Sequence, residues 1–126
     1  MLQNNLEDAG FEVTMVSNGS EALETLKKIK GEANDAGRSV GDYLDVVIAD
    51  IEMPLMDGFS MTKNVKTDED LRQLPVILYS SIITKELRHK GEAVQADEQV
   101  SKPEMNRMAE IAVQLIEKHR GESREQ

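Results

Sequence analysis

The apolar run 46–49, followed at once by Asp50, is the feature that most constrains the fold of this chain. Such a run predicts a short buried strand, and Pro54 and Gly58 behind it mark a turn before a helix. This order is typical of an open parallel α/β sheet, in which ligands bind outside the carboxyl ends of the strands. Asp50 is therefore a candidate site residue. Its alternative role is to end the strand or cap a turn.

Two later segments repeat the pattern of a strand followed by a polar residue. The apolar run 75–79 ends in Ser80, and the short run 99–101 ends in Lys102. If the three strands lie parallel and side by side, a carboxylate, a hydroxyl and an ammonium group meet at one edge of the sheet. That trio suits an anion transferred onto the carboxylate, with Asp50 as nucleophile, Ser80 as hydrogen-bond donor and Lys102 as counter-charge.

Both later residues also have an ordinary structural interpretation. Ser80 can be a hydroxyl that merely ends a strand, and Ser81 beside it offers the same group. Lys102 can be a surface lysine before a helix. The following Pro103 favours the functional role, because proline at a first helical turn fixes the loop that aims the ammonium group.

Composition predicts one compact domain and excludes several classes of function. The chain has 126 residues, no cysteine and a net charge of −9. The length suits a single core, and the absence of cysteine excludes disulfides and thiolate metal sites. The negative charge argues against direct nucleic-acid binding, which depends on Lys and Arg. No apolar run approaches the roughly 20 residues that span a bilayer, so we expect no membrane association and a cytoplasmic location.

The remaining elements follow from apolar spacing and from residues typical of helix ends. Residues 2–9 are predicted to end a helix at Gly10, and the alternating residues 11–16 to form a strand. Residues 20–30 and 59–66 predict two helices, and Thr84 a helix N-cap. Residues 31–41 read as a flexible loop or a frayed helical extension. The last helix has an apolar stripe made of Met105, Met108, Ala109, Ala112, Leu115 and Ile116.

These segments resemble the receiver domain of response regulators in two-component signalling. The matching motifs are DIEMPLMDGF around Asp50, LPVILYSS with Ser80, and SKP with Lys102. The segments IEMP and SSI and the long insert before residue 46 resemble, more narrowly, the receiver half of CheV-type chemotaxis coupling proteins. The resemblance implies a flavodoxin-like doubly wound parallel sheet. It predicts an N-terminally incomplete receiver domain over residues 1–120 and a disordered tail over 121–126.

The first strand of that family, which normally ends in a pair of acidic residues, has no counterpart here. In the family sheet, ordered 2-1-3-4-5, this strand is central. Four or five exposed apolar side chains would cost on the order of 10 kcal/mol, against a typical domain stability of about 5–15 kcal/mol. We therefore expect a sheet that lacks its central strand unless another segment or chain supplies one. The expectation includes marginal stability as a monomer and a homodimer formed by strand exchange.

The resemblance also implies a function and a set of roles. Asp50 would accept a phosphoryl group from a histidine kinase, Lys102 would pair with it, and Ser80 would turn inward and switch a partner-binding face. The expected partner is a histidine kinase or a chemoreceptor signalling complex, and the domain itself is not expected to be an enzyme. Mg²⁺ would be held by Asp50 and by the backbone carbonyl of Glu52, whose side chain is an alternative ligand but is expected to point to solvent. Its binding should be weak or absent without the acidic pair. Gln99 stands where many receivers carry an aromatic residue.

Two alternatives stay open. One is a degenerate or truncated receiver that acts as an interaction module without phosphorylation, which the missing acidic pair favours. The other, ranked lowest, is a small phosphohydrolase with Asp50 as covalent nucleophile and Glu52 at the spacing of the acid that protonates the leaving group. Nothing in the sequence resembles the substrate cap that such an enzyme needs.

Overall fold

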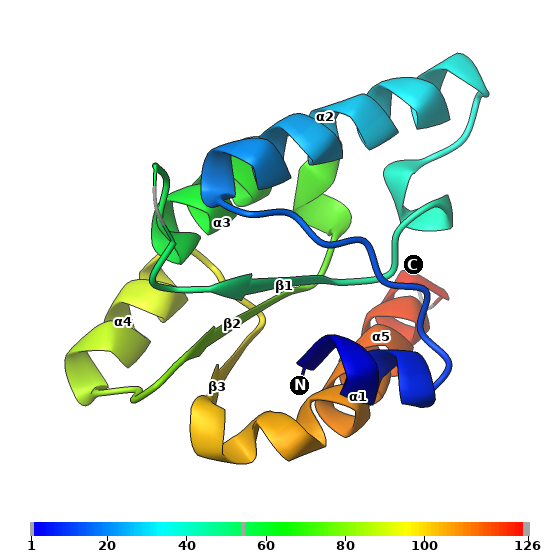
Figure 1. Cartoon of the computed structure of the whole chain (residues 1–126). Coiled ribbons are helices and arrows are strands. Elements are labelled where there is room, and N and C mark those ends of the chain that lie inside the picture. Colours follow the sequence, from blue (N-terminus) through cyan, green and yellow to red (C-terminus); the bar gives the residue numbers. More distant parts are fainter. Residues whose placement is uncertain (1, 54, 125–126) are drawn as a thin grey trace.

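Three parallel strands form the centre of the molecule, with helices on both faces (Figure 1). The computed structural model describes residues 2–53 and 55–124. The strands are β1 (Val47–Asp50), β2 (Val76–Ser80) and β3 (Glu98–Ser101), in the order β1-β2-β3. Within these described ranges this is the α/β architecture with a parallel sheet that the sequence predicts.

The helices form two layers, one on each face of the sheet. One layer contains α2 (Gly19–Asp35) and α3 (Gly58–Thr67), and the other contains α1 (Leu2–Asp8) and α5 (Met108–Arg124). A shorter helix, α4 (Lys85–Ala93), follows β2. Three 3-10 segments complete the described elements: η1 (Val40–Asp42), η2 (Leu71–Gln73) and η3 (Lys102–Arg107).

Each face of the sheet has its own hydrophobic core, because alternate side chains of a strand point to opposite faces. In β2, Val76 and Leu78 pack against α2 and α3, whereas Ile77 packs against α1 and α5. The predicted stripe of the last helix supplies the second core through its buried Met108 and Ala112.

Side-chain caps explain where several helices begin, since the first N–H groups of a helix need an acceptor. The side chain of Asn18 accepts a hydrogen bond from Glu21 N, at 2.8 Å, and Asp57 caps α3. Thr84 caps α4 by accepting from Leu87 N, at 3.1 Å, so the predicted cap is confirmed.

The strand predicted over residues 11–16 is wrong. These residues are extended but form no strand, although their apolar and polar residues alternate. A strand needs a neighbour for its backbone hydrogen bonds, and among the described residues no backbone group of 12–16 has such a partner. The segment crosses above β1 on its way from α1 to α2 (Figure 1).

Residues 31–41 are predicted as a flexible loop or a frayed helical extension, and α2 does extend as far as Asp35. The short segment η1 then begins at Val40, which is buried. Helix α5 runs through Arg124, into the tail for which disorder is expected, and residues 125–126 lie outside the described ranges. No helix in the described part of the chain is long and apolar enough to cross a membrane.

A single carboxylate fastens the amino ends of β2 and β3 to α3. One oxygen of Asp97, Oδ2, accepts hydrogen bonds from Lys66 Nζ and from Val76 N, both at 2.8 Å. Lys66 Nζ also donates to the carbonyl of Leu74, at 2.8 Å, and its side chain is only 8% exposed. We call Lys66, Val76 and Asp97 the amino-end clamp.

Candidate functional site

The register of the sheet brings the three predicted site residues to one edge. Asp50 is the last residue of β1, Ser80 is the last of β2, and Lys102 directly follows β3. Asp50 is level with Tyr79 and Val100, so Ser80 stands one residue and Lys102 two residues beyond the level of Asp50. Neighbouring strands lie about 4.8 Å apart. The carboxylate, hydroxyl and ammonium group therefore belong to one site.

Asp50 is half-buried, and its carboxylate is held by the loop that follows it. Oδ1 accepts a hydrogen bond from the backbone N–H of Glu52, at 2.9 Å. This is the local turn that an Asp after a strand commonly makes, and it fixes the rotation of the side chain. The other oxygen, Oδ2, is in no hydrogen bond or ion pair among the described residues. It is the oxygen available to an incoming group.

The other two candidates differ strongly in exposure. Ser80 is 1% exposed, although it ends its strand, whereas Lys102 is exposed. Within the part of the chain that the structure describes, Lys102 joins no ion pair. Ser101 Oγ donates to Glu104 Oε1, at 3.1 Å, which orders the turn that carries Lys102. An exposed ammonium group that joins no ion pair is suited to bind an anion.

Two glycines shape the loop around Asp50. A Cβ at Gly58 would lie 2.6 Å from the carbonyl oxygen of Asp50 and 2.9 Å from Ile51 Cα. A Cβ at Gly19, where α2 begins, would collide with the backbone of Met56. Both glycines thus let backbone segments approach more closely than any other residue allows. The sequence marked Gly58 only as a turn, because which backbone lies opposite a glycine depends on the tertiary fold.

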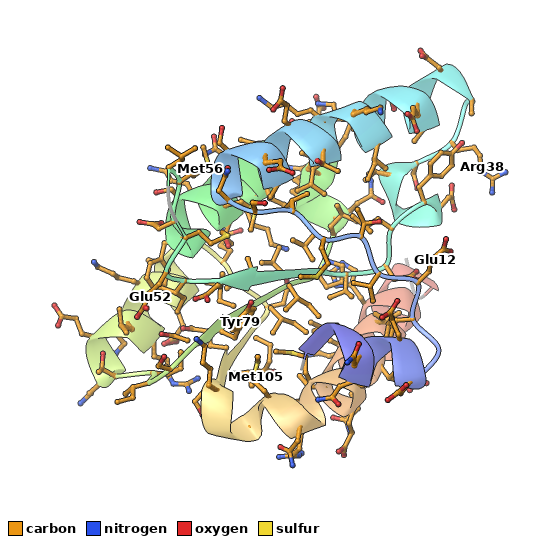
Figure 2. The ribbon with its side chains drawn as sticks, in the orientation of Figure 1. Glu12, Arg38, Glu52, Met56, Tyr79 and Met105 are labelled. Atoms are coloured by element: carbon orange, nitrogen blue, oxygen red, sulfur yellow. The ribbon has the colours of Figure 1, made fainter. Side chains whose placement is uncertain are left out.

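The residues present do not complete a magnesium site. Glu52 is exposed and lies beyond the end of β1 (Figure 2). Asp57 is not available, because its side chain accepts from Ser60 N, at 2.7 Å. Among the described residues no three His, Cys, Asp or Glu side chains form a group that could hold a metal ion. Mg²⁺ requires octahedral oxygen ligands, and Asp50 with Glu52 supplies only part of them.

Tyr79 is a neighbour of the site that sequence reasoning missed. It pairs with Asp50 across β1 and β2, and its ring packs on the face of the sheet covered by α1 and α5 (Figure 2). Burial raises the pKa of the Tyr79 hydroxyl, and the negative charge of Asp50 raises that pKa further. The phenol is thus sensitive to the charge on Asp50. No local sequence signal distinguishes it from an ordinary strand tyrosine.

Gln99 is a second residue whose environment only the structure reveals. It is 9% exposed on β3, and a Cβ at Gly91 of α4 would collide with its side chain. Nε2 donates to the carbonyl of Arg88, at 3.0 Å, whereas Oε1 is buried without a partner among the described residues. An unmade hydrogen bond of this kind costs about 1–3 kcal/mol. Gln99 therefore links β3 to α4 by one hydrogen bond and leaves its side-chain oxygen unpaired among the described residues.

The chain is similar to known proteins over most of its length. The profile of the family described as the response regulator receiver domain matches residues 1–114. The chemotaxis protein CheV2 of Helicobacter pylori is 33% identical over 100 residues, covering 68% of this chain and 32% of CheV2. The sensor histidine kinase CheAY of the same organism is 31% identical over 104 residues, covering 82% of this chain and 12% of the kinase. The chain thus spans a third or less of these two relatives.

Solved structures of receiver domains have a fold similar to that of this chain. The receiver domain of a signal transduction histidine kinase from Syntrophus aciditrophicus has a TM-score of 0.74 and 27% identity, and the match covers 92% of this chain and 79% of that one. The receiver domain of a sensor histidine kinase from Pseudomonas aeruginosa has a TM-score of 0.73 and 20% identity, covering 91% and 84%. That second structure has a magnesium ion coordinated in its active-site cleft.

Proposed function

The chain belongs to the response regulator receiver domain family, and on that premise we propose that it is a phosphoacceptor domain in which Asp50 receives a phosphoryl group from a histidine kinase. The observation that carries this proposal is the register, which sets Asp50, Ser80 and Lys102 at one edge of the sheet. The relatives CheV2 and CheAY favour a role in chemotaxis signalling.

The transfer uses the free oxygen of Asp50. Oδ2 attacks the phosphorus of a phosphohistidine, a P–O bond forms, and the P–N bond to the donor imidazole breaks. The backbone N–H of Glu52, which donates to Oδ1, holds the carboxylate in place during attack. The Lys102 ammonium group offsets the negative charge that gathers on the phosphoryl oxygens, and the Ser80 hydroxyl donates a hydrogen bond to one of them.

The resulting acyl phosphate would switch a partner-binding face. Ser80 is followed by the loop 81–84, in which Ile82 is 69% exposed, and then by α4. A hydrogen bond from Ser80 to a phosphoryl oxygen draws the start of this loop toward Asp50, and α4 moves with it. We propose a chemoreceptor signalling complex as the partner and the cytoplasm as the location. The domain is then the substrate of a kinase and not itself an enzyme.

Our proposal includes only weak binding of Mg²⁺. Asp50 and Glu52 are the acidic residues available to the ion, and they do not complete its coordination. We propose a Mg²⁺ dissociation constant in the millimolar range or weaker. Titration calorimetry of the chain and of Asp50→Asn checks this value. Micromolar binding that persists in Asp50→Asn would show that the ion binds elsewhere.

A phosphorylation-independent interaction module is the second candidate function, and the incomplete metal site favours it. In that case the chain binds its partner equally well before and after exposure to a phosphoryl donor. A homodimer formed by strand exchange is a further proposal for the partner state, supported by the position of β1 at the end of the described sheet, where it pairs with β2 alone. Sedimentation velocity at several concentrations tests that dimer.

Mass spectrometry after incubation with acetyl phosphate and Mg²⁺ tests the main proposal. We expect one added phosphoryl group on the chain and none on Asp50→Asn. Asp35→Asn is the matched control, because it makes the same change at an exposed position at the far end of α2. No label on the chain, with Asp35→Asn unlabelled too, would favour the interaction module. A label that survives in Asp50→Asn would overturn the choice of acceptor.

A further inference from the structure

Two loops at the carboxyl edge of the sheet present apolar side chains to solvent. Leu55, on the loop between β1 and α3, is 85% exposed, and Ile82, on the loop between β2 and α4, is 69% exposed. No other large apolar side chain in the described part of the chain is as exposed as either. We call this pair the apolar rim. A single exposed apolar residue is ordinary on a protein surface, so exposure alone does not assign a role to it.

Both members of the apolar rim lie close to Asp50. The loop that carries Leu55 is closed at its base, because the N–H of Gly58 donates to the carbonyl of the residue after Asp50, at 3.1 Å. Leu55 is three residues from Gly58, a spacing that spans at most about 11 Å of extended chain. Ile82 is two residues beyond Ser80, which ends the strand beside β1. The apolar rim therefore borders the carboxylate from two neighbouring loops.

The backbone of Leu55 has a conformation that leucine rarely adopts. Its φ is 67°, in the left-handed region, where the Cβ atom lies too close to a carbonyl oxygen. Glycine has no Cβ and asparagine tolerates this region, so either residue would suit the loop better. The Leu55 side chain belongs to neither hydrophobic core, and it therefore gives the fold no packing in return. Backbone strain of this kind is concentrated at functional sites.

Transfer of a phosphoryl group from a protein requires contact with the apolar rim. A histidine side chain is short, so Oδ2 of Asp50 reaches the phosphorus only when the donor surface around that histidine lies over the loops beside Asp50. Leu55 and Ile82 are then covered by the donor. Acetyl phosphate places its phosphorus at the same carboxylate but is too small to cover these side chains.

We propose that the apolar rim binds an apolar patch beside the phosphohistidine of the donor protein, which makes Leu55 a specificity-determining residue for the transfer. This inference rests on the proposed function, because it concerns the donor to Asp50. The contact forms before the phosphoryl group moves, so it is separate from the later movement of the loop 81–84. A donor with polar groups at the same place buries them against apolar side chains and is disfavoured.

Two phosphohistidine peptides test the proposal on the full chain. Each is a short capped peptide with one central histidine that has been phosphorylated with phosphoramidate. The histidine lies between leucine residues in the first peptide and between serine residues in the second. We expect the leucine peptide to label Asp50 roughly tenfold faster than the serine peptide, because only its side chains pack on the apolar rim. Mass spectrometry over time follows the added phosphoryl group, and acetyl phosphate serves as the donor without a surface.

Substitutions of Leu55 provide the matched test. Leu55→Asn removes the apolar side chain and suits the left-handed backbone, so the urea midpoint should not fall. We expect the preference for the leucine peptide to disappear in this variant, whereas labelling by acetyl phosphate should stay unchanged. Leu55→Met keeps an apolar side chain and should keep the preference. Val113→Asn is the control, because it makes a similar change at an exposed position of α5.

Three results would overturn the proposal. The first is equal labelling by the two peptides. The second is a preference for the leucine peptide that survives in Leu55→Asn. The third is an equal loss of labelling by the peptides and by acetyl phosphate in Leu55→Asn, because Leu55 would then act on Asp50 itself. Absence of labelling from all three donors on the unsubstituted chain would instead contradict the proposed function, so the two conclusions fail in different ways.

Discussion

Gly58 allows the loop after β1 to approach the backbone of Asp50 closely. Its replacement tests whether this close approach is needed for stability and for the labelling of Asp50. A Cβ there would meet the backbone of Asp50 and Ile51, which cannot yield as a flexible side chain would. We expect Gly58→Ala to lower the free energy of unfolding by about 1–3 kcal/mol and to reduce labelling of Asp50. Urea unfolding and mass spectrometry provide the two measurements.

Gly31 is the matched control for that substitution. It lies within α2, and a Cβ there would meet nothing within 4 Å. Alanine is favoured over glycine inside a helix, so Gly31→Ala should raise the free energy of unfolding by roughly 0.5–1 kcal/mol. Equal effects of the two substitutions would show that Gly58 has no special role beside Asp50.

Tyr79 should report the charge on Asp50. Because burial and the Asp50 carboxylate both raise its pKa, Asp50→Asn should lower that pKa toward the value set by burial alone. The chain has no Trp and two Tyr residues, so a Tyr43→Phe background leaves Tyr79 as the single chromophore. Alkaline titration of phenolate absorbance measures the shift. An unchanged titration would mean that the two groups do not interact.

The helices show how far local sequence determines an element. The cap at Thr84 and the apolar stripe of α5 are local signals, and they predicted where these helices lie. The segment 11–16 has an equally clear strand pattern and is not a strand, because pairing requires a neighbour that no local pattern supplies. The places of Asp50, Ser80 and Lys102 at the carboxyl ends of the three strands could be predicted from the strand pattern. The burial of Tyr79 and Gln99 depends instead on side chains distant in sequence.

The ion pair between α2 and the turn after α3 predicts a pH dependence at the scale of elements. Lys30 Nζ lies 2.9 Å from Asp68 Oδ2. Burial raises the pKa of Asp68, but hydrogen bonds from Lys30 and from the backbone N–H groups of Leu71 and Asp70 outweigh burial and lower that pKa. A lowered pKa stabilises the fold above the unfolded value of about 3.9, and this stabilisation is lost as pH falls through the folded pKa.

Asp68→Asn removes the titrating group and tests that dependence. Above about pH 4 the variant should be less stable than the unsubstituted chain, and the difference should shrink as the pH falls further. Thermal unfolding between pH 2 and 7, on the scale where Asp titrates, measures the difference. Asp35→Asn is the control at an exposed site and should change stability little. A difference that stays constant with pH would contradict the assigned pairing.

A hollow of about 370 Å³, lined by residues of β1 and of the segment 11–17, lowers the stability of the whole molecule, because its lining lacks packing partners. We therefore expect a free energy of unfolding below about 5 kcal/mol, the lower end of the usual range. Urea unfolding at several protein concentrations measures it. A concentration-independent midpoint with a much larger free energy would contradict this expectation, and a midpoint that rises with concentration would indicate the dimer.

The amino-end clamp holds the amino ends of β2 and β3 more firmly than their carboxyl ends. At that end the Lys66 and Asp97 side chains and the N–H of Val76 share one partly buried network, whereas the carboxyl ends of the strands lead into loops. We therefore expect the amino ends of the strands to open less readily than the loops that follow Asp50 and Ser80. A charge added at Asp50 should accordingly displace these loops and leave the amino-end clamp unchanged.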